Sequence, residues 1–514
     1  MTTDRPRTVT DAAAALRAGE VTSVGLTRAA IALADRADRA LGVYVNRFDP
    51  SALDAAERAD RELEAGLDRG PLHGIPIGVK DTIAVAEGPT TAQSVVLDRA
   101  WGARRDAPVV ARLKAAGAVI TGKTTAMEFA CGMPDPAKPF PVPRNPWRPE
   151  AWTGGSSSGT AAGVAAGMFF AGLGSDTGGS IRMPAAFCGV TGLVPTFGLV
   201  PKSGCVPMAY SLDRIGPIAR SARDCAALLE IMAGAHPSDP DSVRCPDRPP
   251  APTHHQSTDE LRSTDRPPAP THRHSTDELR STVLTGLPAA DLSGVRVGVV
   301  REGHFPDGTD PALAGAFDKA VEVLAGLGAS IRTVTLPYWE EMITALYVIS
   351  SCEALAYHRS DLALRWGDYA PHTRGLIATG AMMSGADYVQ AQRVRRVGQN
   401  AVQRLFGEID VIACPTASVG APLFDALAGD DGHLRTDALY PMIHTPYWSS
   451  LGTPVLAVPI GLTAGGLPLS MQLAGPAFGE AAILRAGDVF QQETNWHLRA
   501  PGLDDITEGV GHAR

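Results

Sequence analysis

The feature that most constrains the fold is the stretch TGGSSSGTAAGVAAGMFFAGLGSDTGGSIR, residues 153–182. It contains two Gly-Gly-Ser turns, which end at Ser156 and Ser180, and a small-residue apolar segment joins them. The most apolar part, 161–173, is shorter than the roughly 20 residues needed to cross a bilayer, so it predicts a buried helix. A polar turn that ends in a serine lies at each end of a buried element. This arrangement resembles a nucleophilic serine and an assisting serine that lie close to backbone N–H donors. The pattern therefore indicates a hydrolase.

Strand and helix patterns alternate along the rest of the chain. Apolar residues at every second position, or short β-branched runs, predict strands, and apolar residues at helical spacing predict helices. We expect strands at 74–83, 118–124, 294–302, 329–336, 409–415, 453–462 and 467–476, and helices at 8–18, 22–41, 51–66, 109–117, 221–233, 311–327, across 340–406 and at 480–493. The proline-rich segment 134–149 predicts a long irregular loop. This alternation favours an α/β fold.

A tandem duplication interrupts the pattern. DRPPAPTHHQSTDELRST at 247–264 is followed by DRPPAPTHRHSTDELRST at 265–282, and 16 of the 18 positions match. Two polar, proline-rich copies are too few for a solenoid, so we expect 247–282 to be a flexible insertion whose histidines bind no metal. The chain as a whole is expected to form one domain, 1–514, with N-terminal helices at about 8–66, a catalytic core at about 70–235, and a C-terminal half at 291–500 that completes the sheet and the substrate pocket.

Charge and cysteine usage limit the setting in which the chain works. The formal net charge is −9, and this argues against a protein that binds a nucleic-acid backbone, because such proteins present a basic face. The seven cysteines include no CxxC pair, so we expect neither a disulfide framework nor a zinc cluster. We therefore expect a location in the reducing cytoplasm. The N-terminus has no apolar run of signal-peptide length.

Ser180 is the stronger candidate for the nucleophile. Two glycines precede it, and residues without Cβ allow successive N–H groups to point into one concavity of the kind that stabilises an oxyanion. The G-x-S-x-G elbow of α/β-hydrolases does not fit, since residue 182 is arginine. The glycine-rich turns do not match a phosphate-binding loop either, because GGSSSGT lacks the Lys-Ser or Lys-Thr ending. From this motif alone, a glycine-rich turn with a capping serine is an equal alternative.

The base that activates this serine is harder to identify. No histidine lies in either turn, and a surface or core role is favoured for His73. Lys80 follows an apolar strand, and a lysine among apolar side chains loses the hydration of its charged form. Its pKa then falls, and the neutral amine becomes available as a base. From the residues alone, a lysine with its head in water or paired with Asp81 is favoured over this role.

The chain closely resembles the amidase signature family in four segments: GIPIGVKD (74–81), GGSSSGT (154–160), GSDTGGSIRMPAAFCGVTGLVPT (174–196) and SLDRIGP (211–217). A weaker resemblance continues through 452–461 and 466–476. Together these segments extend the resemblance over most of the chain except the insertion at 247–282. It implies a three-layer α/β/α sandwich with a large central mixed β-sheet. It also implies an amidase, a hydrolase that acts on linear C–N bonds other than peptide bonds, with no metal and no cofactor.

The family's catalytic residues match three positions of this sequence. Lys80 matches the general base, Ser156 the relay serine that follows a cis peptide bond, and Ser180 the serine that is acylated. The resemblance implies that Lys80 takes the proton of Ser180 through Ser156 and that water then cleaves the acyl-enzyme. The oxyanion is expected to be received by four backbone N–H groups, those of Thr177, Gly178, Gly179 and Ser180.

Further residues are expected to support the site. Asp176 and Arg182 flank the nucleophile and are expected to hold its loop, and Ser157, with its neighbour Ser158, is expected to orient Lys80 or Ser156. An apolar or aromatic acyl pocket is expected around Met127, Cys131, Cys205 and Tyr210, with Tyr447 and Trp448 as further aromatic candidates. A plain packing role is at least as strongly favoured for each of these pocket residues.

Three forms of this chemistry remain open. One is a stand-alone amidase for carboxylic amides, aryl amides or esters, a second is the glutamine-hydrolysing A subunit of a tRNA-dependent amidotransferase, and a third is a carbamate or urea hydrolase. The duplicated insertion and the diverged C-terminal half favour the first form. With it we expect a small-molecule amide or ester substrate, no nucleic-acid partner and no membrane partner, and we leave a homodimer open. The intact set of Lys80, Ser156 and Ser180 argues against a non-enzymatic interaction protein.

Overall fold

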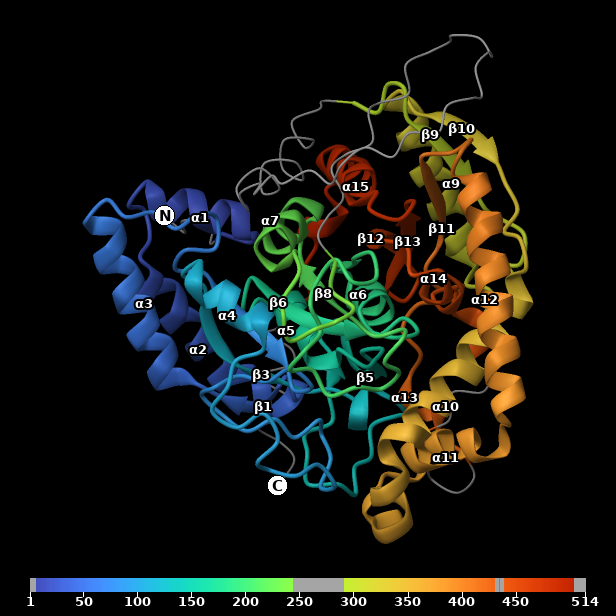
Figure 1. Cartoon of the computed structure of the whole chain (residues 1–514). Helices are drawn as coiled ribbons and strands as arrows, with labels where there is room; N and C mark the ends of the chain where they lie inside the picture. The colour runs from blue at the N-terminus through green and yellow to red at the C-terminus, as the bar shows by residue number, and fades with distance from the viewer. Residues whose placement is uncertain (1–5, 244–290, 430–433, 435–438, 503–514) are drawn as a thin grey trace, which may run out of the picture.

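The computed structural model describes residues 6–243, 291–429, 434 and 439–502, and a single mixed sheet of 11 strands forms its centre (Figure 1). In spatial order the strands are β1 (Tyr44–Arg47), β3 (Val119–Thr124), β2 (Pro76–Lys80), β6 (Ala171–Asp176), β8 (Arg214–Ala219), β7 (Thr191–Val194), β12 (Val455–Leu462), β13 (Pro468–Ala474), β11 (Val411–Pro415), β9 (Arg296–Val299) and β10 (Ser330–Thr333). The sheet is mixed because β2 runs parallel to both of its neighbours, whereas β6 and β8 are antiparallel.

Helices cover both faces of this sheet. The described helices are α1 (Val9–Arg17), α2 (Ser23–Leu41), α3 (Asp49–Glu64), α4 (Pro108–Ala115), α5 (Ser158–Ala166), α6 (Arg182–Cys188), α7 (Ala222–Met232), α9 (Pro311–Gly326), α10 (Trp339–Arg365), α11 (Pro371–Thr379), α12 (Gly385–Leu405), α13 (Phe424–Leu427), α14 (Pro446–Leu451) and α15 (Glu480–Thr494). Short 3₁₀ turns lie at η1 (Glu128–Ala130), η2 (Trp366–Asp368), η3 (Gly380–Met382), η4 (Tyr440–Met442) and η5 (Trp496–Leu498).

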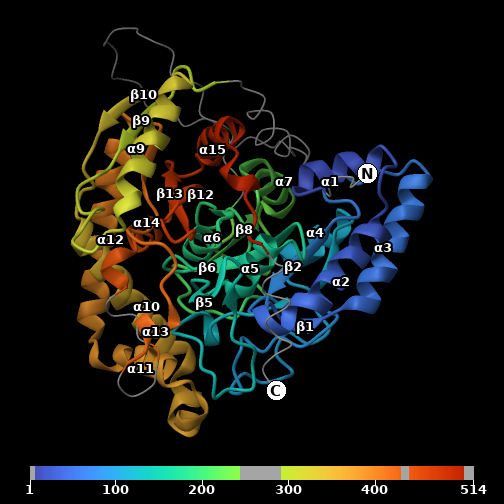
Figure 2. The same ribbon diagram turned by 180° about the vertical axis from the view of Figure 1, so that it is seen from behind.

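The alternation of side chains along β11 shows how the layers are built. Val411 and Ala413 belong to the same buried cluster as residues of α1, α4, α7, α9 and α15. Ile412 and Cys414, which point to the opposite face, belong to a cluster with residues of α10, α12 and α14. In both views α1, α2 and α3 lie near the β1 end of the sheet and α12 lies at the opposite side of the molecule (Figures 1 and 2). The predicted three-layer α/β/α sandwich with a large mixed sheet is confirmed.

Two local expectations need correction. The segment 161–173 is not one buried helix, because α5 ends at Ala166, where Gly167 adopts a left-handed conformation with φ 76° and turns the chain into β6. The segment 134–149 is not wholly irregular, because β4 (Arg144–Asn145) and β5 (Arg148–Trp152) form a small antiparallel sheet. Pro146 lies between the two strands and Pro149 lies within β5, and both are tolerated because each strand of a two-stranded sheet is an edge strand.

The predicted insertion at 247–282 lies outside the described residues, and the division of the chain into one domain with four segments stays a prediction. Within the described part of the chain, no helix combines the length and the apolar character needed to cross a membrane. The six cysteines of that part are free thiols.

Candidate active site

Lys80 is the last residue of β2, the third strand from the β1 end of the sheet, and its side chain is fully buried. Its Nζ atom donates hydrogen bonds to Ser156 Oγ at 2.7 Å and to Ser175 Oγ at 2.9 Å. Burial lowers the pKa of Lys80 from its ordinary value of 10.5 to about 7, although nearby Cys205, Asp176 and Asp213 act in the opposite direction. A large fraction of Lys80 is therefore neutral at physiological pH.

Asp81 does not pair with Lys80. Its carboxylate instead lies 3.3 Å from the Nζ atom of Lys123, on the neighbouring strand β3, and both side chains are fully buried. Lys123 also donates a hydrogen bond to Thr90 Oγ1 at 2.9 Å. The sequence-based alternative, in which Asp81 neutralises Lys80, is therefore not the arrangement found, and no carboxylate forms an ion pair with Lys80 within the described residues.

Ser156 is held in the turn between β5 and α5. The peptide bond between Gly155 and Ser156 is cis. The next residue, Ser157, donates its backbone N–H to the carbonyl oxygen of Ser180 at 3.0 Å, and this bond joins the two glycine–serine turns. Ser158 closes the turn by donating its hydroxyl to Gly154 O at 2.7 Å.

Ser175 is a site residue that the sequence pattern did not predict. It lies on β6, five positions before Ser180, and its carbonyl oxygen accepts hydrogen bonds from Lys80 Nζ at 3.3 Å and from Ser157 Oγ at 3.1 Å. The hydroxyl of Ser175 also accepts a hydrogen bond from Lys80 Nζ. The signal that could have found it is the parallel pairing of β2 with β6, because adjacent parallel strands that end at one edge bring their last residues together.

Ser180 lies between β6 and α6, and unlike Ser156 and Lys80 it is partly exposed. A partly exposed hydroxyl can meet a substrate, while a buried lysine and relay serine stay away from bulk water. Among the described residues, no acceptor is bonded to the backbone N–H groups of Gly178 and Ser180. The N–H of Gly179, in contrast, donates to Asp176 Oδ1 at 2.9 Å. Of the four expected oxyanion donors, the N–H of Gly179 therefore already donates to a carboxylate in this structure.

Asp176 and Arg182 form a fully buried ion pair at 3.0 Å around the nucleophile loop. The Asp176 carboxylate also accepts the N–H of Ile181 at 3.0 Å. Burial alone would raise the pKa of Asp176, but the charge and hydrogen bonds of Arg182 hold it down at about 2. Arg182 reaches further, because its Nη1 donates to Thr445 O at 2.8 Å and its Nη2 to Ser449 Oγ at 2.6 Å. The pair therefore fixes both ends of the loop and ties it to α14.

The four expected pocket residues have different surroundings. A Cβ atom placed on Gly155 would lie 3.0 Å from Met127 Cγ, so Met127 packs directly against the cis turn. Cys205 lies beside the residues that follow Lys80, through a β-bridge to Ile83. Cys131 is buried, which raises the pKa of its thiol to about 12. Tyr210 is 49% exposed and is the site of a cation–π contact with a lysine.

Two aromatic residues that suggested an apolar substrate group are part of the protein core. Tyr447 and Trp448 are fully buried on α14, and the Tyr447 hydroxyl donates to the carbonyl of Pro337 at 2.9 Å. They belong to the buried cluster that includes residues of α10 and α12. Their aromatic character therefore carries no information about the substrate.

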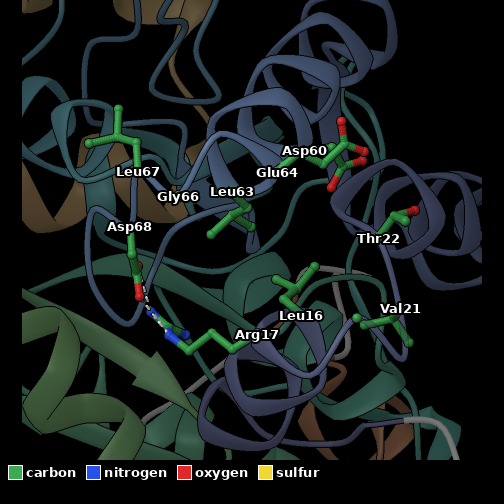
Figure 3. A pocket seen from close by; sticks show the side chains of 11 residues that line it. Leu16, Arg17, Val21, Thr22, Asp60, Leu63, Glu64, Gly66, Leu67 and Asp68 are labelled. Carbon is green, nitrogen blue, oxygen red and sulfur yellow. Dashed lines mark hydrogen bonds and ion pairs between the residues drawn. The ribbon is translucent and has the colours of Figure 1, made fainter.

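A surface cavity of about 450 Å³ lies between the end of α1, the turn that precedes α2, and the end of α3 with the residues that follow it (Figure 3). Leu16, Leu63 and Leu67 contribute its apolar lining, and an ion pair at 2.8 Å joins Arg17 and Asp68 at its edge. None of the predicted site residues lines it. The cavity is therefore separate from the glycine–serine turns.

Comparisons with known proteins agree on one family. The sequence model of the family described as Amidase matches residues 25–267 and 269–484. The A subunit of glutamyl-tRNA(Gln) amidotransferase from Roseiflexus sp. (strain RS-1) is 38% identical over 96% of this chain and 98% of its own length.

Two solved structures show the same fold. A chain from a vestigial protein complex, described as revealing the evolutionary origins of an s-triazine catabolic enzyme, has a TM-score of 0.81 and 30% identity, over 95% of this chain and 98% of that one. Native peptide amidase from Stenotrophomonas maltophilia has a TM-score of 0.76 and 27% identity, over 97% of this chain and 99% of that one.

The relatives contradict one expectation. The name of the Roseiflexus protein specifies both a tRNA and a subunit of a larger enzyme, so the expectation of no nucleic-acid partner, with a possible homodimer as the only assembly named, is wrong. The expectation failed because a net charge of −9 averages over the whole chain. It says nothing about a local basic surface, or about a partner subunit that carries the RNA contacts.

Proposed function

Because the chain belongs to the amidase signature family, we propose that it cleaves a carboxylic amide C–N bond through an acyl-enzyme on Ser180. It is an amidase-family enzyme, and the finer class, a hydrolase of linear C–N bonds other than peptide bonds, is part of the proposal. The observation that carries it is the 2.7 Å hydrogen bond between Lys80 Nζ and Ser156 Oγ, in a turn that is bonded to Ser180.

The proposed reaction uses this geometry as follows. A neutral Lys80 has a lone pair that accepts the Ser156 proton along the 2.7 Å line, while Ser156 takes the proton of Ser180. The Ser180 oxygen bonds to the amide carbon, and the carbonyl electron pair moves to the oxygen, which the N–H groups of the 177–180 loop receive. When this intermediate collapses, the C–N bond breaks and the proton returns through Ser156 to the leaving nitrogen. Water then releases the acid by the same relay.

Among the forms of this chemistry, the relatives favour the A subunit of a tRNA-dependent amidotransferase over the stand-alone amidase. The identity of 38% extends over nearly the full length of both chains, which is a closer match than the 30% and 27% of the two solved structures. We therefore propose glutamine as the amide donor, with glutamyl-tRNA(Gln) and a partner subunit in the complete enzyme. A stand-alone amidase, or a carbamate or urea hydrolase, is the second candidate, and the s-triazine and peptide amidase neighbours support it.

Product release separates these candidates, measured as ammonia from L-glutamine or propionamide and as p-nitroaniline from p-nitroacetanilide. The chain is purified alone, and also by mild affinity capture from its own host, and each preparation is given L-glutamine, propionamide or p-nitroacetanilide, with and without glutamyl-tRNA(Gln). We expect glutamine hydrolysis to be faster in the captured complex and to rise with the tRNA. Rapid cleavage of the simple amides by the isolated chain, with no turnover of glutamine in either preparation, would overturn the amidotransferase proposal and leave the amidase chemistry in place.

The proposal also covers the domain organisation, the location and the cofactor requirement of the chain. The chain forms one amidase signature domain, which is supported by strands from both halves in one sheet. Its location is the cytoplasm, which the free thiols of the described part support. The chemistry needs no metal and no organic cofactor, because a serine, a relay serine and a lysine supply the nucleophile and the base.

A further inference from the structure

Asp213 lies in the segment SLDRIGP, just before strand β8. Strands β6 and β8 are antiparallel and their last pair is Asp176 with Arg214, so Thr177 and Asp213 lie opposite each other one step beyond it. Thr177 Oγ1 donates a hydrogen bond of 2.5 Å to Asp213 Oδ1. Both residues are buried, with 3% and 8% of their surface exposed. The segment thus contacts the first residue of the nucleophile loop.

The Asp213 carboxylate is itself held by its own turn. It accepts the backbone N–H of Met208 at 2.9 Å and that of Ala209 at 3.1 Å. A buried carboxyl group with several donors around it has little freedom to rotate. Asp213 is therefore a fixed anchor for the Thr177 hydroxyl.

The nucleophile loop is held at three successive residues. Asp213 accepts the hydroxyl of Thr177, Thr445 Oγ1 donates to Gly178 O at 2.8 Å, and Asp176 accepts the N–H of Gly179. The Asp176 contact is local in sequence, whereas Asp213 and Thr445 come from other segments. An oxyanion site depends on donors that are already aimed before the charge develops, so these anchors control where the N–H groups point.

We propose that Asp213 is a positioning residue of the oxyanion loop and acts through the hydroxyl of Thr177. The inference rests on the proposed function, because it assumes that Ser180 is the nucleophile and that the 177–180 loop receives the oxyanion. Loss of the Thr177–Asp213 bond is then expected to slow steps in which negative charge develops on oxygen, without weakening the binding of the unreacted substrate.

The test uses Thr177→Val, Asp213→Ala and the double variant. Thr177→Val removes only the hydroxyl from a side chain of the same shape, so it guards against an Asp213→Ala variant that does not fold. Thr494→Val is the matched control, since the Thr494 hydroxyl donates to Phe490 O on α15. The probe is an alkyl fluorophosphonate, whose phosphorus bonds to Ser180 Oγ as fluoride leaves, while the serine proton passes through Ser156 to Lys80. The label is read by mass spectrometry, and Ser180→Ala reports separately on the proposed nucleophile.

We expect Thr177→Val to lower the second-order labelling rate about tenfold. Turnover of the best amide in the panel is expected to show the loss in kcat, with KM changed less than twofold. Since both changes remove one interaction, the double variant is expected to be no slower than Asp213→Ala alone. Parent-like labelling by Thr177→Val, losses that multiply in the double variant, or a change confined to KM would overturn the inference. If Ser180→Ala still labels at the parent rate, the proposed function fails instead.

Discussion

Lys80 Nζ and Ser156 Oγ lie 2.7 Å apart although their residues are separated by 76 positions in the chain. The contact exists because β2, an interior strand of the 11-stranded sheet, ends beside the turn that starts α5. Lys80 is fully buried there without a carboxylate partner of its own, and this combination lowers its pKa to about 7. The proposed mechanism follows from this one relationship.

The first prediction concerns pH. The pKa of Lys80 is lowered to about 7 in the folded protein, so protonated Lys80, which cannot act as a base, predominates below that value. We expect kcat/KM for an amide to rise as pH increases through about 7 and then to reach a plateau. The measurement is kcat/KM against pH from 5 to 9.5 for one amide that does not itself titrate in this range. A rate that is flat between pH 5 and 8 would contradict the assignment of Lys80 as the base.

The second prediction concerns the relay serine. Replacing Ser156 with alanine removes the hydroxyl between Lys80 and Ser180, and we expect kcat to fall by roughly 10² to 10⁴, the usual contribution of a positioned proton-transfer group. The fold is expected to remain, which far-ultraviolet circular dichroism checks. Ser51→Ala is the control, because the Ser51 hydroxyl, on α3, donates to the carbonyl oxygen of the N-cap residue Phe48. Retention of more than a tenth of the parent kcat would show that Ser156 is not in the proton path.

The third prediction concerns Ser175, whose hydroxyl accepts a hydrogen bond from Lys80 at 2.9 Å. Its loss in Ser175→Ala removes a group that favours the charged form, so we expect the acid limb of the pH profile to move to lower pH. The plateau rate is expected to fall about tenfold, because the amine is less well aimed. A lower plateau with an unmoved acid limb would mean that Ser175 serves the fold and does not act on Lys80.

The fourth prediction separates the two buried lysines by stability. Lys123→Met leaves the buried Asp81 carboxylate without its cation, so we expect the free energy of unfolding to fall by about 3 kcal/mol. Lys80→Met removes a buried amine with no ion-pair partner, and we expect an unfolding free energy equal to or above that of the parent, together with loss of activity. Urea unfolding at pH 7.5 measures both.

Lys114→Met, which breaks partly exposed ion pairs with Glu87 and Asp106, is the control for this comparison. It is expected to cost less than about 1 kcal/mol. Equal destabilisation by Lys80→Met and Lys123→Met would show that both lysines are structural.

The sequence predicted the elements well and the long-range pairing poorly. Strand 409–415 and helix 480–493 were expected within a residue or two of their bounds, because apolar periodicity is a local signal. From the residues alone, Lys80 was favoured as a solvated lysine or a partner of Asp81. Only the neighbouring strand, which brings Lys123 to Asp81, shows why Lys80 is left without a carboxylate.

The supporting residues of the site show the same limit. Asp176 and Arg182 were expected to hold the loop because they flank Ser180 in the sequence, and they form a buried ion pair around it. Ser175 and Asp213 were missed, since their roles depend on how β6 pairs with β2 and with β8. Thr445 reaches Gly178 across 267 positions, a distance over which local pattern gives no information.

The most direct test of the account is the location of the covalent intermediate. The enzyme is mixed with an activated p-nitrophenyl ester, quenched in acid within a few turnovers, digested and mapped by mass spectrometry. We predict an acyl group on the peptide that contains Ser180, with no adduct and no amide turnover in the Ser180→Ala variant. An acyl group on another residue, or a Ser180→Ala variant that turns over amides at the parent rate, would contradict the central claim.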